Sequence, residues 1–336
     1  MTTTVNTLAE GQRLIDPPLR SALDRLDPAT RHVCGYHLGF WDSDGSPISG
    51  AGKGIRPALA LLSARAAGAG DEIGIPAALA CELIHNFSLL HDDVMDQDTE
   101  RRHRTTAWAQ FGIPAAILAG DALCSLASEL LAEAPSATTA WAVRCITAST
   151  RRLIAGQAAD LAFESRQEVD LAECLKMAGD KTAALMACSA SLGAVLADAP
   201  SGLALGLAEF GEHLGLAFQL ADDILGIWGN PERTGKPVLS DLRSRKKSVP
   251  VVYALQSNTA AGDRLGELYA RTDTLSEAEL DQAAAMVEAA GGRAWTEQRA
   301  DEELQAAMTG IGVLSLPEPV RQEFTAVATQ LRGRDR

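Results

Sequence analysis

The chain has 336 residues, of which 46% are hydrophobic and only 4% aromatic, and its formal net charge is -14. This composition excludes a disordered chain, and it favours helices over strands because alanine and leucine dominate while aromatic residues are few. The negative charge argues against a general affinity for nucleic acid or anionic lipid.

The cysteines and the N-terminus indicate a reducing compartment. The six cysteines show no C-x-x-C spacing, and the N-terminus has no basic-then-apolar pattern. The most apolar windows are interrupted by Glu82 and His85, or by Asp121 and Glu129, so none gives a clean membrane span. We therefore expect a cytoplasmic protein that is not an integral membrane protein.

The N-terminal segment, residues 1–50, is expected to form a helix and a loop that pack on the rest of the chain. The helix covers about 8–26 and is interrupted at Asp16-Pro17-Pro18, and dense Pro and Gly punctuation marks the loop that follows. Helical pattern resumes at Ile55, where Pro57 suits a first turn. We find no break in composition, which predicts a single all-α domain over 1–336.

The central helix is expected from about Ile75 to Asp98, with Pro76 near its start. No segment alternates with period two, and no fixed-period repeat occurs. Helical patterns also cover 113–132, 137–163, 168–197, 202–228, 240–256, 260–271, 276–290, 292–309 and 318–332.

Two acidic motifs carry the clearest chemistry. Asp92, Asp93 and Asp96 stand at i, i+1 and i+4, so Asp92 and Asp96 share a helix face, and Asp222 with Asp223 repeats the doublet later in the chain. Carboxylates this close repel one another unless a cation joins them, and oxygen-only ligands suit Mg²⁺. Solvated helix surface would also explain acidic runs, but both doublets follow apolar helical sequence directly.

Basic and polar residues accompany these motifs. Lys53 and Arg56 stand in GKGIRP, whose glycines permit close backbone approach to phosphate oxygens. Arg101 and Arg102 follow the acidic helix, where the helix dipole alone would also favour cations. Later parts of the chain add Lys181, Thr182, Gln219, Lys236, Arg243, Arg245, Lys246 and Lys247. Two carboxylate clusters with cations between them suit a magnesium-bridged pair of diphosphates.

These residues resemble the motifs of isoprenyl diphosphate synthases of the trans-prenyltransferase (polyprenyl synthetase) type. GKGIRP resembles the GKxxRP loop of that family, and IHNFSLLHDDVMD resembles its first aspartate-rich motif. KTAAL is similar to its lysine-threonine helix, and FQLADDILG, with GKP and RKKS after it, resembles its second motif. The resemblance runs in the family's order through most of the chain.

The resemblance implies a bundle of antiparallel helices around a deep apolar cavity, usually as a homodimer, with the two acidic motifs facing each other across its mouth. It implies that Mg²⁺ clamps an allylic diphosphate with help from Asp92, Asp93, Asp96, Asp222, Arg101, Lys181, Gln219 and Lys236. It implies that isopentenyl diphosphate is bound by Lys53, Arg56, His85 and Arg102, with Lys246 and Thr182 bordering the reacting groups.

The chain departs from the family's pattern at several positions, which include Ala51 and Gly54 in the first loop. Gly226 stands where the family commonly has a third aspartate, so we expect altered metal binding at Asp222 and Asp223. His103 follows the arginine pair where glycine is usual.

The resemblance also implies that product length depends on Phe87, five positions before Asp92, because in the family a large residue at this depth tends to act as a floor for the growing chain. An ordinary core phenylalanine is the alternative. With Ser88 beside Phe87, the motif resembles geranylgeranyl diphosphate synthases, with farnesyl diphosphate synthases as the close competitor.

Two other functions stay open. A class I terpene cyclase could share the scaffold, but the chain has no NxxSxxxE motif, and Lys53, Arg56 and His85 would have no role. A non-catalytic regulatory subunit of a prenyltransferase would tolerate damaged aspartates, whereas Asp92, Asp93 and Asp96 are intact.

Overall fold

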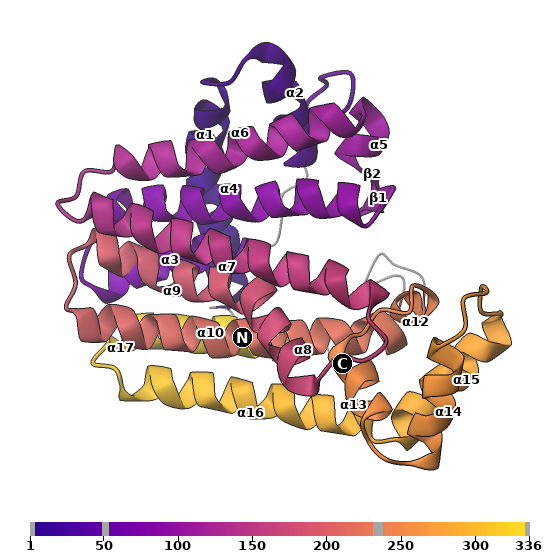
Figure 1. Cartoon of the computed structure of the whole chain (residues 1–336). Helices are drawn as coiled ribbons and strands as arrows, with labels where there is room; N and C mark the ends of the chain where they lie inside the picture. Colours follow the sequence, from indigo (N-terminus) through magenta and orange to yellow (C-terminus); the bar gives the residue numbers. More distant parts are fainter. Residues whose placement is uncertain (1–3, 49–53, 231–237, 333–336) are drawn as a thin grey trace. The chain divides into compact units, whose positions relative to one another are not determined.

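The computed structural model describes residues 4–48, 54–230 and 238–332 (Figure 1). Helices dominate this part of the chain, and its strands are only β1 (Glu100–Arg101) and β2 (Arg104–Thr105). The all-α prediction is confirmed. The chain divides into two compact units: unit 1 comprises 1–150, 185–211 and 308–330, and unit 2 comprises 151–184, 212–307 and 331–336.

The boundaries between the units fall inside helices. Unit 1 contains α1 (Thr4–Leu23), α2 (Pro28–His37), α3 (Ile55–Ala66), α4 (Asp71–Met95), α5 (Ala107–Phe111) and α6 (Ile113–Ala132). It also holds most of α9 (Ala184–Leu196) and α17 (Glu318–Arg332), while α7 (Thr139–Ser165), α10 (Ser201–Trp228) and α16 (Gly292–Val313) belong partly to each unit. The single domain over 1–336 stays a prediction.

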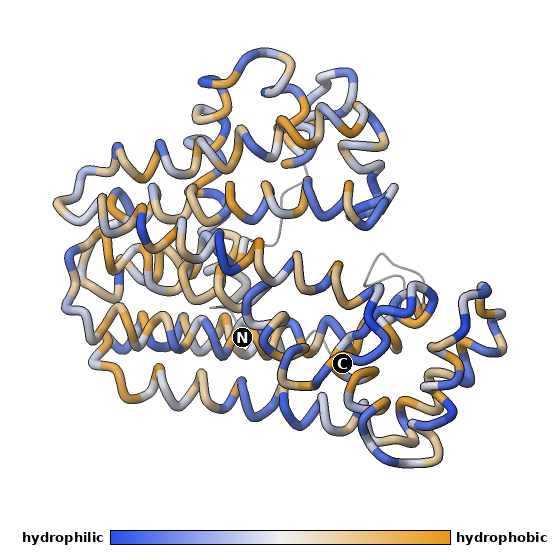
Figure 2. The backbone as a smooth tube through the Cα atoms, in the orientation of Figure 1, coloured by the Kyte–Doolittle hydropathy of each residue, from blue (hydrophilic) through white to orange (hydrophobic). Residues whose placement is uncertain are grey.

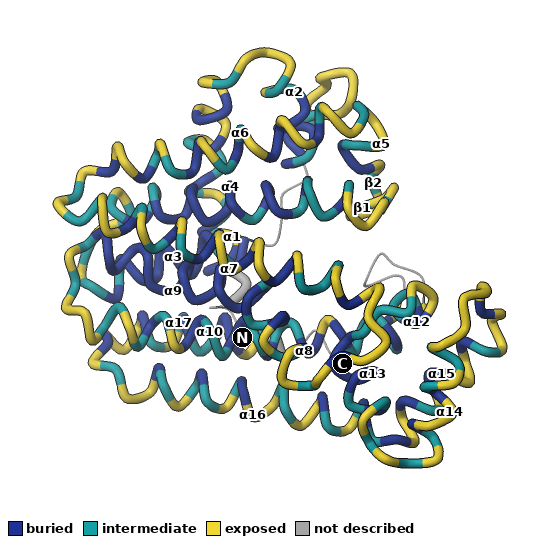
Figure 3. Tube along the Cα trace, in the orientation of Figure 1, coloured by how far each residue is buried: buried dark blue, intermediate teal, exposed yellow. Residues whose placement is uncertain are grey.

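Unit 1 is centred on α3 and α9, which Figure 3 shows almost entirely buried. The two helices meet at a glycine: a Cβ atom on Gly193 would lie 2.2 Å from the carbonyl oxygen of Ala60 and 2.6 Å from Ser63 Oγ. Glycine therefore allows the two backbones to touch.

Helix α4 carries the first acidic motif at its C-terminal end. Gly70 precedes it, and Asp71 and Glu72 in its first turn complement the helix dipole. Figure 2 shows hydrophobic residues along its length and hydrophilic residues where it approaches β1. Most of the helix is thus buried in the core, while its C-terminal end is exposed to solvent.

Two helices are long and apolar enough to span a membrane by length and composition alone, namely α4 and α6. Within the apolar window of α4, 72% of residues are buried in the protein, as in a core helix, against 39% for α6. On α6, Ile113, Ile117 and Leu118 are exposed. The expectation that no window would qualify as a span is therefore wrong for these two, although their membrane status stays untested.

Unit 2 begins in the second half of α7. It continues through α8 (Leu171–Ala178), the π-helical turn η1 (Gly179–Ala183), α12 (Ser240–Arg243), α13 (Val249–Leu255), α14 (Ala260–Tyr269) and α15 (Glu277–Ala289). One apolar cluster joins Phe163 of α7 to Cys174 of α8, Leu220 of α10 and Val249 of α13. Leu220 of this cluster stands just before the second acidic motif, so the cluster fixes the part of α10 that carries the motif.

Several predicted elements differ from the observed ones. Helix α1 runs through Pro17 and Pro18 without interruption, because Ile15, Leu19 and Leu23 bury one face that outweighs the lost hydrogen bonds. Helix α4 begins at Asp71 rather than Ile75.

The helix expected over 240–256 is two helices, because Arg245 has a left-handed backbone (φ 53°) that no α-helix continues. Helices α2 and α5 were not predicted. All six cysteines are free of disulfides, as expected, and four of them are buried.

Candidate functional site

The two carboxylates of the first doublet face different surroundings. Asp93 is buried, and its Oδ1 accepts a hydrogen bond from Arg101 Nε at 2.7 Å. Asp92 is half-buried, and Asp96, the C-cap of α4, is exposed. Burial raises the pKa of Asp93 to about 6, although Arg101 opposes the shift. Asp92 and Asp96 are therefore the accessible pair of the motif.

Arg101 and Arg102 follow on a two-residue hairpin. Glu100 pairs with Thr105 and Arg101 with Arg104, so Arg102 and His103 form the turn. Both turn residues have positive φ, 52° and 60°. Two-residue hairpins need positive φ at both central positions, which explains why glycine would suit position 103.

His85 lies among positive charges about two helical turns before Asp92. Burial, followed by the charges of Arg56 and Arg102, holds the pKa of His85 well below its usual range. Burial, followed by the charges of Arg101, Arg102 and Arg104, lowers the pKa of His37 to about 3. Both imidazoles are thus neutral, and the structure brings together His85, Arg56 and Arg102 as predicted. Lys53 lies outside the described residues.

His37 was missed by sequence reasoning, since a single histidine at the end of α2 follows no motif. Buried Glu82 was also missed: Asn86 Nδ2 donates to its Oε1 at 3.0 Å, and its negative charge acts on Arg102. His37 and Glu82 both interact electrostatically with the arginines of the basic cluster.

The two chain-length candidates lie in the core of α4. Phe87 is buried and makes an edge-to-face contact with His91, with 4.9 Å between ring centroids. His91 in turn is within hydrogen-bonding distance of the Ile117 carbonyl, at 3.1 Å, on α6. Ser88 donates to the carbonyl of His85 at 2.8 Å. Phe87 is therefore a buried residue of α4 that packs against the ring of His91, and His91 in turn reaches α6.

The second doublet, in unit 2, repeats the division seen in the first. Asp222 is exposed, whereas Asp223 is buried and accepts hydrogen bonds from Gln219 Nε2 at 2.8 Å and from the backbone N–H of Val249 at 3.0 Å. Burial raises the pKa of Asp223 to about 6, although Lys246 opposes the shift. Both oxygens of Asp223 thus have partners within the protein.

The lysine-threonine motif lies in the π-helical turn. Thr182 Oγ1 donates to Gln219 Oε1 at 2.5 Å, which links this turn to α10. Lys181 Nζ donates to Asp160 Oδ2 of α7 at 2.6 Å, and Lys246 Nζ lies 3.8 Å from the same oxygen. Lys181, Thr182, Gln219, Asp223 and Lys246 are therefore gathered as predicted.

Asp160 was missed by sequence reasoning. A useful signal was the glycine four residues before it, since i and i+4 share a helix face and Gly156 permits a close neighbour there.

The space next to Gly226, where a longer side chain would lie, is filled by another carboxylate. A Cβ atom on Gly226 would lie 2.4 Å from one oxygen and 2.6 Å from the other oxygen of the Asp241 carboxylate. Asp241, on α12, thus occupies the space beside Asp223 into which a longer side chain at 226 would extend. Lys236 lies outside the described residues.

A metal ion at these motifs would have to take some of its ligands from water and from the substrate. In the described part of the chain, no three His, Cys, Asp or Glu side chains gather as a metal-binding group. Mg²⁺ commonly takes one or two carboxylates and fills its other positions with water and phosphate oxygens. The accessible carboxylates of Asp92 and Asp96 in unit 1, and that of Asp222 in unit 2, each fit that mode of binding.

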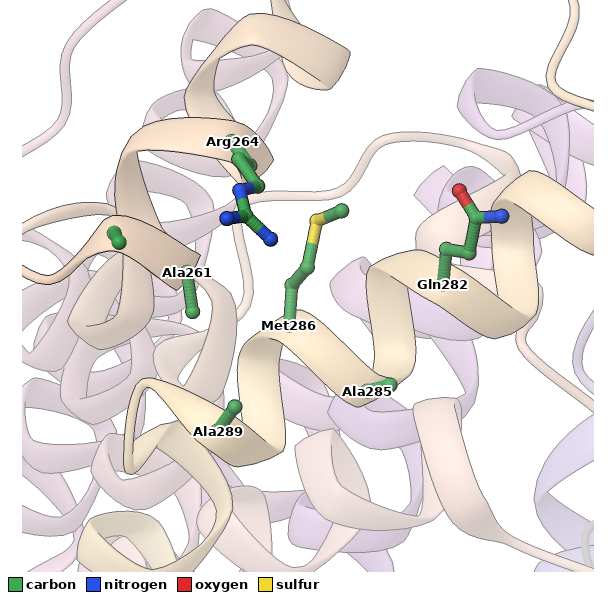
Figure 4. Close-up of a pocket in the computed structure, with 7 residues that line it drawn as sticks. Ala261, Arg264, Gln282, Ala285, Met286 and Ala289 are labelled. Atoms are coloured by element: carbon green, nitrogen blue, oxygen red, sulfur yellow. The ribbon is translucent and has the colours of Figure 1, made fainter.

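A separate hollow lies between α14 and α15, with a volume of about 400 Å³ (Figure 4). Its lining consists of alanines with Arg264, Gln282 and Met286. None of the predicted site residues lines it, and it has no carboxylate, so it is no candidate for the diphosphate site.

Known proteins resemble the chain over almost its whole length. The model of the family described as polyprenyl synthetase matches residues 46–287. A (2E,6E)-farnesyl diphosphate synthase from Mycobacterium tuberculosis (strain ATCC 25618 / H37Rv) is 49% identical over 97% of this chain and 92% of that protein. A geranylgeranyl diphosphate synthase from the same strain is 41% identical over 94% of this chain and 89% of its own.

A solved structure of the same family is similar to this chain in its fold as well. A crystal structure of polyprenyl synthetase from Streptomyces coelicolor A3(2) superposes with a TM-score of 0.92 at 48% sequence identity, covering 97% of this chain and 98% of that chain.

Proposed function

Since the chain belongs to the polyprenyl synthetase family, we propose that it condenses isopentenyl diphosphate head-to-tail with an allylic diphosphate to give a short-chain prenyl diphosphate. As a member of this family it is an enzyme that transfers prenyl groups. The observation that supports the proposal best is the repeated doublet, in which one carboxylate stays accessible and its neighbour is buried at each motif.

The proposal gives the residues of the site distinct tasks. Asp92, Asp96 and Asp222 would hold Mg²⁺, while Asp93 and Asp223 support the motifs through Arg101 and Gln219. When bound, Mg²⁺ would neutralise charge that develops on the leaving diphosphate. Lys181 and Lys246 add positive charge to the same diphosphate, and Arg56, His85 and Arg102 bind isopentenyl diphosphate.

The reaction breaks the allylic C–O bond and one C–H bond, and it forms one C–C bond. The C–O bond breaks with its electron pair going to the diphosphate, and the double bond of isopentenyl diphosphate attacks the resulting cation. The new cation formed by this attack loses a proton to the released diphosphate, and the C–H electron pair becomes the double bond of the product. Apolar side chains exclude water, which would otherwise quench the cation.

The proposed product is the C20 compound, geranylgeranyl diphosphate, because Phe87 is buried at the depth at which a floor is expected. The C15 compound is the second candidate, favoured by the 49% identity to a farnesyl diphosphate synthase. We also propose that the reaction requires Mg²⁺. We further propose that the protein is cytoplasmic and forms a homodimer, and sedimentation analysis tests the dimer.

The experiment is incubation of the purified protein with isopentenyl diphosphate and each allylic diphosphate, with and without Mg²⁺, followed by mass spectrometry. We expect elongation to C20 that stops when EDTA removes the metal. No elongation with any substrate would refute the proposal, whereas hydrocarbon formed without isopentenyl diphosphate would favour a cyclase. Full biological activity of Asp92→Ala would favour a regulatory subunit.

Phe87→Ala tests the floor. Removing the ring should shift the product by at least one isoprene unit beyond that of the wild type, because the cavity deepens. Leu90→Ala, another fully buried truncation on α4, is the matched control and should leave the product length unchanged. An unchanged product from Phe87→Ala means that Phe87 is an ordinary core residue.

A further inference from the structure

Asp160 is a carboxylate shared by two lysines in unit 2. Its side chain is only 14% exposed, and its Oδ2 lies 2.6 Å from Lys181 Nζ and 3.8 Å from Lys246 Nζ. The lysines come from η1 and from the segment before α13, and Asp160 comes from α7. One carboxylate therefore fixes cations that are distant from each other in the sequence.

The backbone around Lys181 holds the lysine in place as well. A Cβ atom on Gly156, one turn before Asp160, would lie 2.3 Å from the backbone nitrogen of Lys181 and 2.6 Å from its Cα. The neighbours of Lys181 in the π turn have other partners: Asp180 accepts from Arg152 at 2.8 Å, and Thr182 donates to Gln219. Lys181 is thus the residue of this turn that is directed to Asp160.

Both lysines are also partly open to solvent. Their side chains are 18% exposed at Lys181 and 35% exposed at Lys246, so an anion can approach both ammonium groups. Lys246 in addition acts on the carboxylate of Asp223.

We propose that Asp160 is a positioning residue, which holds the ammonium groups of Lys181 and Lys246 side by side so that they bind the allylic diphosphate together. The inference rests on the proposed function, because it assigns these two lysines to that diphosphate. Without the carboxylate, the ammonium groups repel each other and lose their common direction.

The test compares Asp160→Asn with the wild type by steady-state kinetics and by calorimetric binding of inorganic pyrophosphate in Mg²⁺ buffer. We expect about a tenfold rise in the KM for the allylic substrate and in the Kd for pyrophosphate, with the KM for isopentenyl diphosphate within about twofold. A pure charge effect predicts the opposite, since the variant site has one more positive charge. Tighter pyrophosphate binding, or unchanged affinity, would overturn the proposal.

The matched control is Asp180→Asn. Asp180 is a carboxylate of similar exposure, 11%, that also pairs with two cations, Arg152 and Lys176, next to Lys181 in the sequence. Its loss should lower the thermal stability as Asp160→Asn does but leave both KM values and pyrophosphate binding unchanged. Asp160→Glu should recover at least part of the pyrophosphate affinity.

Failure of the proposed function gives a different result. In that case the wild type would elongate no substrate, yet weakened pyrophosphate binding by Asp160→Asn would still support the positioning role. An active wild type whose affinities do not respond to Asp160→Asn, or respond equally to Asp180→Asn, overturns the positioning role alone.

Discussion

At the scale of single residues, the two aspartate doublets show that adjacent carboxylates differ in their surroundings. Asp93 and Asp223 are buried and hydrogen-bonded, and both have pKa values raised to about 6. Asp92 and Asp222 remain more accessible. The second aspartate of each doublet is therefore fixed inside the protein, while the first is open to solvent.

The raised pKa of Asp93 predicts that this residue lowers the free energy of unfolding of the metal-free protein as the pH rises. The folded state keeps its proton to about pH 6, whereas the unfolded chain loses it near its usual value of 3.8, so the stabilising contribution is lost as the pH rises. The free energy of unfolding of Asp93→Asn, relative to the wild type, should rise by up to about 3 kcal/mol between pH 4 and pH 7. Urea unfolding in EDTA measures this difference.

Asp273→Asn is the control for that series. Arg271 lowers the pKa of the exposed Asp273 to about 2, so its contribution is lost only when the pH falls below about 4. Its difference from the wild type should be flat over the same range. A flat difference for Asp93→Asn, or one of opposite sign, contradicts the prediction.

His103 gives a second prediction at this scale. Its left-handed backbone, at φ 60°, is strained for a side chain with a Cβ atom but not for glycine. His103→Gly should stabilise the protein by about 0.5–1 kcal/mol in thermal or chemical unfolding. His103→Ala keeps the Cβ atom and should bring no gain. Equal stabilities of the two variants would show that the backbone strain is absent.

At the scale of elements, glycines set the distance between helices. Gly156 brings α7 against η1 in unit 2, and Gly193 brings α9 against α3 in unit 1. At both positions the atom nearest to such a Cβ atom would be a backbone atom, the nitrogen of Lys181 or the carbonyl oxygen of Ala60. The helices would have to separate to admit it.

These two glycines allow a matched comparison. Gly156→Ala and Gly193→Ala should each destabilise the protein by about 1–3 kcal/mol, because overpacking shifts the backbone. Only Gly156→Ala should also raise the KM for the allylic diphosphate, since it displaces Lys181. Thermal unfolding and steady-state kinetics check both parts. Equal KM values for both variants would mean that displacement at Gly156 does not reach the site.

Element patterns were largely predictable from the sequence. The helix at 113–132 is observed with those bounds, and Pro57 lies in the first turn of α3 as expected. The prolines of α1 misled the prediction, because the burial of Leu19 and its neighbours depends on tertiary packing. The break at Arg245 has no glycine or proline to announce it.

The site was predictable only where motifs mark it. Asp92, Asp223 and Lys181 stand in recognisable patterns, whereas Asp160 and His37 follow none. The burial of Asp93, against the exposure of Asp96, depends on which carboxylate meets Arg101 in the folded chain. Pairwise spacing along one helix does not contain that information.

At the scale of the whole molecule, the two compact units share helices α7, α10 and α16. A helix that continues from one unit into the other couples their unfolding, because its hydrogen bonds are lost together. We therefore expect the protein to unfold in one cooperative transition, as the single-domain prediction requires.

Differential scanning calorimetry tests this expectation. The calorimetric enthalpy should agree with the van't Hoff enthalpy, and probes in the two units, Trp108 and Trp295, should report the same midpoint. Two variants separate the signals, each of which keeps a single one of the chain's five tryptophans, either Trp108 or Trp295. Two resolved transitions would show that the units are independent domains.

The π-helical turn at Gly179–Ala183 changes the phase of the chain. An α-helix advances 3.6 residues per turn, so one added residue rotates everything after it by about 100° relative to what precedes it. Residues of α8 and α9 that seem aligned on one helical wheel therefore lie on different sides. The segment over 168–197 has to be read as two wheels joined at Lys181. Because the π turn holds one residue more than an α-turn, a one-residue deletion there would leave a regular α-helix in which α9 keeps its register with α3.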